Sequence, residues 1–250
     1  MSTTVRVERV EGATTLRLDG TDRLNAVSKE TMLELQARML EAGRDAATKV
    51  VVLAGAGQAF CAGADLSEEI DVSTVMDVAA DSIRTIVDLD VPVIAAVRGP
   101  AVGFGAALLA ACDLAIAAES SYVELSHTRI GLMPDGGLTH TLAAAMGRAM
   151  AGDLVHSGRR LSAREAMDAG LVSRVVPDAE FDGVLADLMR SVSERPRAAL
   201  VASKLALNAQ WREELDAALA RESSAQISLL GSPDFTRLTS RFRTAERSRS

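Results

Sequence analysis

Three short apolar runs, separated by stretches with a helical pattern, constrain the fold of this chain more than any other feature. The runs are KVVVLA at 49–54, VPVIAAV at 91–97 and DLAIAA at 113–118. Uninterrupted apolar strands of this length are typical of a sheet that is covered on both faces. Their alternation with helices, including a predicted helix over 75–89, therefore indicates an α/β fold with a mainly parallel sheet.

The segment before the first run predicts a hairpin and a helix. Alternating residues over 5–18, with a turn at 11–13, favour the hairpin. Ser28 is a suitable N-cap for a helix that runs towards Arg44. The apolar face expected for this helix consists of Met32, Leu33, Leu35, Met39 and Leu40.

The second half of the chain changes character at Pro196. Before it, Ser162 and Glu165 form a capping box that begins a helix, Gly170 ends that helix, and 171–177 predicts a strand. After it the pattern predicts only helices, with a polar end over 243–250 that we expect to fray. We therefore expect an α/β core over 1–195 and a C-terminal helical subdomain over 196–250.

Charge and composition exclude several partners. The net charge of −7 disfavours a nucleic-acid binder. The two cysteines, Cys61 and Cys112, have neither metal-ligand spacing nor a disulfide framework, which favours a reducing compartment. The beginning of the chain lacks a signal-peptide layout, and no apolar run approaches the roughly 20 residues of a membrane span. We expect a soluble, cytoplasmic protein without a metal site or a membrane partner.

A glycine-rich loop, GAGQAFCAGADL at 55–66, follows the first apolar run. A dinucleotide site is a weak interpretation, because Phe60 stands where the third glycine belongs and no Walker lysine follows. For Gly55 and Gly57 alone, a tight turn between strand and helix is the favoured interpretation.

Two further loops carry candidate chemistry. RGPAVGFGAALLAACD at 98–113 follows the second apolar run and begins a helix. Free N–H groups at such a helix start suit an oxyanion, although its small residues equally suit close helix packing. In ELSHTRIGLMPDGGLT at 124–139, Asp135 is a carboxylate among glycines and apolar residues, either functional or part of a turn.

Taken together, these loops resemble the enoyl-CoA hydratase/isomerase (crotonase) family. AFCAGADL is similar to the family's first oxyanion-hole loop, RGPAVGFGAALLAACDLAIA to its second, and SHTRIGLMPDGGLTHTL to its catalytic loop. RLNAVS, SAREAMDAGLVSRVVP, SKLALNAQ and SPDFTRLTSRFR extend the resemblance over nearly the whole chain. It implies a spiral of ββα units with a C-terminal helical region that makes trimer contacts.

The resemblance also assigns roles to residues. The backbone N–H groups of Ala64 and Phe104 would form an oxyanion hole for a thioester carbonyl. The only cofactor implied is coenzyme A, as part of the substrate. Residues expected to bind the acyl-CoA are Arg23, Ala62, Asp65, Leu66, Gly105, His127, Lys204 and Phe242.

The chain departs from the family's hydratases at three positions. Ala107 and His127 stand where hydratases carry two glutamates, so efficient hydration is not expected. Phe104 replaces a common glycine, and its side chain is expected to narrow the acyl pocket. Asp135 falls where some members, including enoyl-CoA isomerases, place a catalytic aspartate.

Three functions stay open at this level. The first is double-bond isomerisation of an enoyl-CoA, with Asp135 carrying the proton. The others are weak hydration through His127 and non-catalytic binding of acyl-CoA. A trimer or hexamer is expected from the resemblance and from apolar residues of the helical tail, namely Leu215, Leu219, Ile227 and Leu230.

Overall fold

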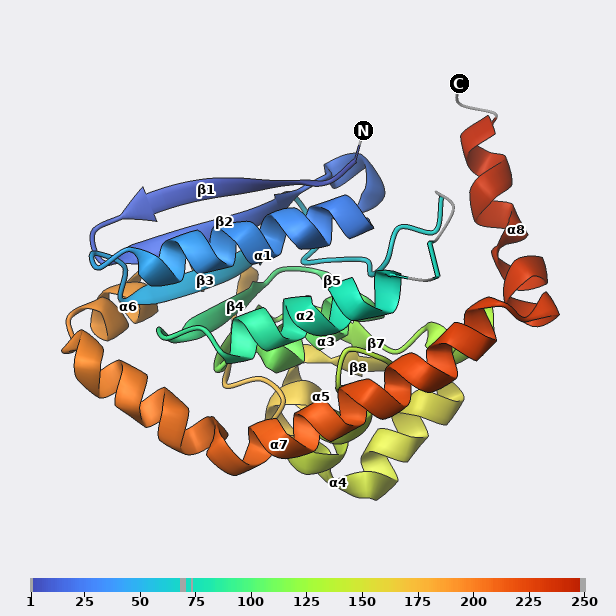
Figure 1. Cartoon of the computed structure of the whole chain (residues 1–250). Helices are drawn as coiled ribbons and strands as arrows, with labels where there is room; N and C mark the ends of the chain where they lie inside the picture. The colour runs from blue at the N-terminus through green and yellow to red at the C-terminus, as the bar shows by residue number, and fades with distance from the viewer. Residues whose placement is uncertain (1, 68–70, 73, 248–250) are drawn as a thin grey trace.

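The computed structural model describes residues 2–67, 71–72 and 74–247. Its main sheet has the order β1-β2-β3-β4-β6-β9 (Figure 1). β1 and β2 form the predicted antiparallel hairpin, and every other neighbouring pair in this sheet is parallel. The predicted α/β fold with a mainly parallel sheet is therefore confirmed. The strands of this sheet are β1 Thr4–Val10, β2 Ala13–Asp19, β3 Val50–Gly55, β4 Val93–Val97, β6 Leu114–Ala118 and β9 Arg174–Val176.

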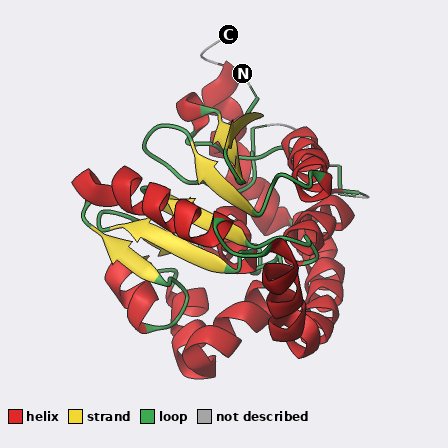
Figure 2. Ribbon diagram, turned by 90° about the vertical axis from the view of Figure 1, so that its left-hand side faces the viewer, coloured by secondary structure: helices red, strands yellow, loops and turns green. Residues whose placement is uncertain are grey.

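Helices cover both faces of the main sheet (Figure 2). Because side chains alternate along a strand, Val51 and Leu53 point to one face while Val50 and Val52 point to the other. The first face packs against α1, α2 and α3, and the second against α6. These helices are α1 Lys29–Arg44, α2 Val75–Val87, α3 Phe104–Ala111 and α6 Phe181–Ser193.

A second sheet, which the sequence did not predict, has the order β5-β7-β8. Its strands are β5 Pro100–Val102, β7 Tyr122–Glu124 and β8 Arg160–Ser162. An isolated bridge between Cys61 and Ala101 joins the 55–66 loop to its edge. Around it lie three short helices η1 Thr21–Arg23, η2 His127–Ile130 and η3 Asp178–Glu180, with α4 Leu138–Ser157 and α5 Ala163–Asp168.

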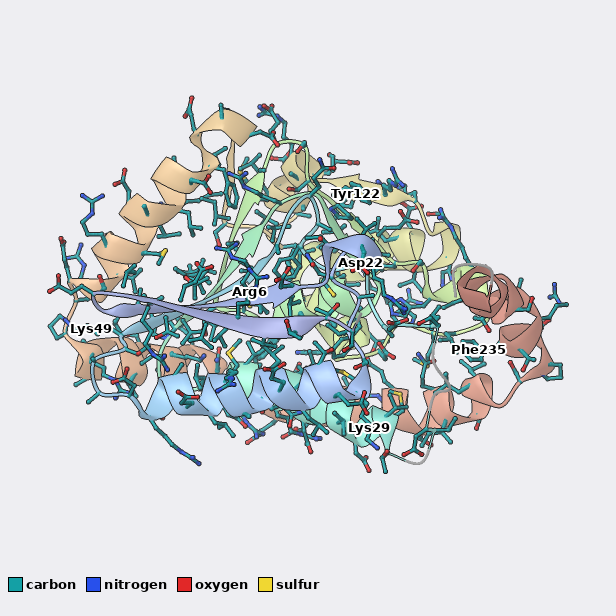
Figure 3. All side chains as sticks on the ribbon, turned by 90° about the horizontal axis from the view of Figure 1, so that it is seen from above. Arg6, Asp22, Lys29, Lys49, Tyr122 and Phe235 are labelled. Carbon is teal, nitrogen blue, oxygen red and sulfur yellow. The ribbon has the colours of Figure 1, made fainter. Side chains whose placement is uncertain are left out.

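The chain ends in two helices, α7 Arg197–Leu230 and α8 Pro233–Arg247, as predicted after Pro196. Figure 1 shows α7 running along the body and α8 leading away from it. Leu215 and Leu219 of α7 belong to the main core and are almost fully buried within this chain. Figure 3 labels Phe235 of α8 at one end of the molecule and Lys49 at the other. The domain boundary at 195/196 stays a prediction, since α7 shares the core.

Three of the four apolar residues that were expected to make oligomer contacts are buried within the chain. Leu215, Leu219 and Leu230 are 1%, 2% and 8% exposed, because they pack inside the chain rather than on its surface. Ile227 remains 45% exposed, and Leu207 of the same helix is 80% exposed. The trimer or hexamer stays a prediction that these two exposed side chains, not the three buried ones, now support.

Several local predictions can be compared with the structure. Ser28 caps α1 by accepting a hydrogen bond from the N–H of Thr31, and the capping box of α5 is present. Leu33 and Leu40 are 45% and 43% exposed, so assigning them to the apolar face of α1 was wrong. The strand expected over 171–177 is shorter, because the N–H of Leu171 closes α5 on the carbonyl of Ala166.

Helix α8 extends to Arg247, close to the end of the chain. Residues 243–247 continue α8 and 248–250 lie outside the described residues, so the fraying expected over 243–250 stays a prediction. Within the described ranges, no helix is both long enough and apolar enough to cross a membrane.

Candidate active site

The two glycine-containing loops meet at one edge of the main sheet. They follow β3 and β4, two parallel neighbours whose carboxyl ends lie on the same side. A β-carbon built on Gly63 would lie 2.8 Å from the carbonyl oxygen of Val102 and 3.4 Å from the nitrogen of Phe104. Only glycine permits this approach, which brings the backbone of both loops together.

Two backbone N–H groups at this junction have no hydrogen-bond acceptor among the residues that the structure describes. The N–H of Phe104 opens α3, where helix geometry provides no acceptor. The N–H groups on either side of Ala64 are used, since Gly63 donates to the sulfur of Cys61 and Asp65 to the carbonyl of Val27. Among the described residues, neither Ala64 nor Phe104 donates its own N–H. The loops thus present two adjacent donors.

The segment 23–25 holds the first loop in place. The carbonyl of Leu24 accepts the N–H of Ala62 at 3.0 Å. Asn25 is fully buried, and its amide donates to the carbonyls of Ala56 and Ala59 at 2.9 and 2.7 Å. Arg23 pairs with Asp65 at 2.8 Å, which places its guanidinium beside the loop. The predicted binding residues Arg23, Ala62 and Asp65 are therefore brought together here.

The side chains of Asp135 and His127 lie next to each other beside the second loop. Nε2 of His127 lies 3.5 Å from Oδ1 of Asp135, and the two side chains are only 7% and 14% exposed. A β-carbon built on Gly103 would lie 3.8 Å from that Nε2, which places the imidazole next to the second loop. The alternative that Asp135 caps the following helix is wrong, because α4 has Gly137 as its N-cap residue and receives no side-chain hydrogen bond from Asp135.

Helix α7 supplies two buried side chains that the sequence did not single out. Gln226 donates to Oδ2 of Asp135 at 2.9 Å and also exchanges hydrogen bonds with the backbone N–H and carbonyl of Met133. Glu222 accepts the N–H groups of Gly137 and Thr139 at 2.6 and 2.8 Å, so it supplies the cap that α4 needs. Burial raises the pKa of the Glu222 carboxyl, and the charge of Asp135 adds to that rise.

No sequence signal identified these two residues, since both lie about 90 positions away from the loop that they contact. One indirect signal existed. Polar Glu222 and Gln226 occur four positions apart, between the apolar Leu219 and Leu230, and thus fall on the buried face of a helix. Buried polar residues require hydrogen-bond partners, and the unpaired N–H groups at the start of another helix are suitable partners for a carboxylate such as that of Glu222.

A cavity of about 100 Å³ lies between the loops, α2 and α7. Among the described residues its wall is mostly apolar, and the polar side chains that line it are Ser126, His127, Asp135 and Gln226. Phe104 is a lining residue and is only 5% exposed, and the narrowing of the pocket by its side chain stays a prediction. Other lining residues include Ala62, Ala64, Leu66, Met76, Leu132 and Leu230.

Ala107 has no access to this cavity. It is fully buried, and a β-carbon built on Gly136 would lie 2.5 Å from its own β-carbon. The same built atom would lie 3.2 Å from the Phe104 ring. The 134–137 loop and Phe104 thus fill the space into which a longer side chain at 107 would extend.

Two predicted binding residues do not fit that role, and the role predicted for a third is not tested. Lys204 is 5% exposed, and its ammonium is bound by Asp113 at 2.8 Å and by the carbonyls of Ile86 and Val91. It is therefore a structural lysine, and its assignment to coenzyme A was wrong. Gly105 packs against Cys61, whose carbonyl oxygen would lie 2.3 Å from an added β-carbon. Phe242 falls within 241–250, whose side chains lie outside the described part of the structure.

Cys61 belongs to the first loop but is not a lining residue of the cavity. Burial raises the pKa of the Cys61 thiol to about 12, so this cysteine stays protonated and serves as a small loop residue. Across the described residues, no three His, Cys, Asp or Glu side chains are grouped to hold a metal ion.

Comparison with known proteins agrees with this geometry. Residues 8–247 match the family model described as enoyl-CoA hydratase/isomerase. A probable enoyl-CoA hydratase of Rhodobacter capsulatus is 36% identical, over 93% of this chain and 91% of that protein. The 1,2-epoxyphenylacetyl-CoA isomerase of Escherichia coli is 33% identical, over 86% of each chain.

A solved structure gives the same result for the fold. The crystal structure of an enoyl-CoA hydratase from Mycobacterium avium subsp. paratuberculosis K-10 superposes with a TM-score of 0.90 at 34% identity. The match covers 98% of this chain and 97% of that one. The crotonase-like fold expected from the sequence is therefore confirmed.

Proposed function

Because the chain belongs to the enoyl-CoA hydratase/isomerase family, we propose that it isomerises the double bond of an enoyl-CoA through an enolate intermediate. Relatives carry both hydratase and isomerase names, so the choice between them depends on the site itself. The observation that carries the proposal is the orientation of Asp135. Asp135 lines the cavity, and Gln226 holds its Oδ2, while Oδ1 is buried 3.5 Å from Nε2 of His127 and has no hydrogen-bond partner among the described residues.

The thioester carbonyl is proposed to bind between the N–H groups of Ala64 and Phe104. Removal of a proton next to the carbonyl moves negative charge onto the carbonyl oxygen, and two fixed donors stabilise that charge. Losing one such donor typically lowers a rate by about 10²–10³. Backbone donors also need no reactive side chain at either position, which suits the alanine and phenylalanine found here.

Asp135 is proposed to carry the proton. Its carboxylate takes the proton from C2 of a 3-enoyl-CoA, and the electron pair moves into the conjugated enolate. The same carboxyl returns the proton to C4, which yields the 2-enoyl-CoA. No net proton or water is consumed, so one carboxylate suffices where hydration requires a held water molecule and a second group.

The pantetheine and nucleotide parts of coenzyme A are proposed to leave the cavity past Ala62 and Leu66, with Arg23 nearby. Arg23 is 27% exposed and can approach a phosphate while it stays paired with Asp65. A cytoplasmic homotrimer or homohexamer is part of the same proposal, supported by the family match and by the exposed Leu207 and Ile227.

A second candidate function is weak hydration, which the position of His127 favours. His127 lines the cavity, its Nε2 lies 3.5 Å from Oδ1 of Asp135, and an imidazole can act as a general base. The absence of a carboxylate at position 107 argues against high rates. Non-catalytic binding is disfavoured, because Asp135 lines the cavity with a carboxylate whose Oδ1 has no hydrogen-bond partner among the described residues. A carboxylate with a purely structural role would be expected to have both oxygens hydrogen-bonded.

The test compares two reactions of the wild-type protein at equal enzyme concentration. Conversion of 3-butenoyl-CoA to crotonyl-CoA measures isomerisation, and loss of crotonyl-CoA absorbance in water measures hydration. The proposal expects isomerisation to exceed hydration by at least tenfold in kcat/KM. Hydration equal to or faster than isomerisation would select the second candidate, and binding without either reaction would select a non-catalytic role.

A further inference from the structure

His140 is a mostly buried titratable residue that the proposed reaction does not use. It lies in the first turn of α4, and its side chain is only 14% exposed. Among the described residues, its Nε2 is buried without a hydrogen-bond partner. Its Nδ1 lies 3.6 Å from Oε2 of Glu214, which is too far for a hydrogen bond. Because buried histidines are usually hydrogen-bonded, this ring is not fixed in one protonation state.

Two residues of α7 lie against the ring. The centre of the nearer Trp211 ring is 5.9 Å from the centre of the imidazole, and the two planes are tilted by 48°. The side chain of Glu214 is 57% exposed, so it has room to move. Gln210 donates to Oε1 of Glu214 at 3.5 Å, which leaves Oε2 for the histidine. An indole face and a carboxylate are both partners for a cation rather than for a neutral ring.

We propose that His140 is a pH-dependent latch between α4 and α7. When the ring takes up a proton, its Nδ1–H donates a hydrogen bond to Oε2 of Glu214, and its positive charge lies against Trp211. Closure from 3.6 Å to about 2.8 Å, the usual length of a charge-assisted hydrogen bond, requires only a small movement of the exposed Glu214 side chain. A neutral ring lacks both attractions.

The elements packed against α4 supply more carboxylates than free cations. They are α3, α7 and η2, and α3 carries no charged side chain. The other titratable or charged groups near the start of α4 are Glu214 and Glu222 of α7, Asp135 of the preceding loop, and His127 and Arg129 of η2. The guanidinium of Arg129 is bound elsewhere, by Glu124 and the carbonyl of Gly158.

The start of a helix ordinarily disfavours a cation, because its free N–H groups carry partial positive charge. In α4 this effect is reduced, since Glu222 accepts the N–H groups of Gly137 and Thr139. Glu214 is therefore the decisive partner for a protonated His140, as the carboxylate that lies nearest to its ring.

The latch acts on the segment that carries Asp135. α4 begins directly after that loop, and Glu222 and Gln226 of α7 already hold residues 133–139. Leu215 of α7 packs against Gly137, where an added β-carbon would lie 2.2 Å from its Cδ1. A hydrogen bond from His140 to Glu214 adds one more tie between α7 and this segment. We therefore expect α7 to be attached more firmly in acid, with or without a substrate.

Trp211 reports the latch directly, because it is the only tryptophan of the chain. A protonated imidazole in contact with an excited indole accepts an electron and quenches its emission, whereas a neutral imidazole does so only weakly. We expect the emission of the wild type to fall by about a third or more between about pH 8 and about pH 5.5, where histidine gains its proton. Constant emission over this range would overturn the inference.

Three variants assign the change to its residues. His140→Gln should abolish the fall in emission, and His156→Gln, at an exposed position of the same helix, should leave it intact. Glu214→Gln alters an exposed side chain, and the fall should then require about threefold more protons or higher, because the carboxylate no longer favours the charged ring. A fall that persists in His140→Gln, or that Glu214→Gln does not move, would contradict the latch.

Hydrogen exchange tests the attachment of α7 itself. Wild type and His140→Gln are compared at the same pH, so that the intrinsic exchange rate cancels. We expect the amides of 211–226 to exchange about threefold or more slowly in the wild type at about pH 5.5 and equally in both proteins at about pH 8. Equal rates at both values would show that the proton does not fasten α7. Neither measurement uses a substrate, so failure of the proposed isomerisation would leave both results unaffected.

Discussion

Gln226 of α7 donates a hydrogen bond to Oδ2 of Asp135 at 2.9 Å, although 91 positions separate the two residues. The same side chain is hydrogen-bonded to both backbone groups of Met133, so it fixes the loop as well as the carboxylate. Helix α7 therefore helps to form the cavity, together with the loops of the core. Asp135 has one oxygen held by Gln226 and one without a hydrogen-bond partner among the described residues.

Replacement of Gln226 by leucine should lower kcat more than it raises KM. The carboxylate then loses the contact that orients it, whereas the cavity that binds the acyl group keeps its volume. We expect a loss of about tenfold or more in kcat, in line with one hydrogen bond to a charged group. Steady-state kinetics of the isomerase reaction checks this, with Gln210→Leu on the exposed side of α7 as the control. A rise in KM alone would show that Gln226 shapes binding instead.

Phe104→Ala should shift the acyl preference towards longer chains. The ring lines the cavity, and its removal leaves room for several methylene groups, each worth about 0.8 kcal/mol on burial. We expect the ratio of Kd for octanoyl-CoA to Kd for butyryl-CoA to fall at least tenfold. Phe181→Ala, which empties the opposite core face, is the matched control for lost stability. An unchanged ratio in Phe104→Ala would mean that the ring does not limit the pocket.

Lys204→Met should destabilise the protein without weakening acyl-CoA binding. Breaking the buried pair leaves Asp113 and two backbone carbonyls without the ammonium, and such losses typically cost about 3–5 kcal/mol. Urea unfolding measures the stability, and calorimetry with butyryl-CoA measures the affinity. A folded variant with affinity more than tenfold weaker would restore Lys204 as a coenzyme A contact.

Glu222 should make the stability of the protein depend on pH. Burial raises its folded pKa above the unfolded value, so the folded state binds the proton more tightly. The contribution of Glu222 is therefore fully present below the unfolded pKa and is lost as pH rises through the folded pKa. We expect the free energy of unfolding of wild type, measured relative to Glu222→Gln, to decrease as pH rises above about 4.5. A relative stability that increases with pH would contradict this sign.

The fold was predictable because local patterns and tertiary structure agree. The three apolar runs become β3, β4 and β6, and the hairpin and both helix caps lie where their residue types place them. The small sheet of β5, β7 and β8 escaped prediction, because its strands are three residues long and carry no alternating pattern. Leu33 and Leu40 show the other limit, since periodicity marks an apolar face but does not say how much of it is covered.

The site was predictable only where backbone and loop sequence define it. Ala64, Phe104, His127 and Asp135 all line the cavity, and they were singled out because the loops that hold them have recognisable sequences. Gln226 and Glu222 were missed, because their roles depend on how α7 crosses the 134–137 loop. Lys204 was misassigned for the same reason. The sequence shows a lysine in the segment SKLALNAQ, which resembles the family, but only the packing shows that its charge is buried against Asp113.

The measurement that tests the central claim most directly is the isomerisation of 3-butenoyl-CoA by Asp135→Asn. The substitution keeps the size of the side chain and the acceptor for Gln226 but removes the base. We predict that kcat falls at least a hundredfold, within the usual contribution of a general base, while Kd for butyryl-CoA stays within about threefold of wild type. A variant that folds, binds butyryl-CoA and isomerises 3-butenoyl-CoA at the wild-type rate would contradict the assignment of Asp135 as the proton carrier.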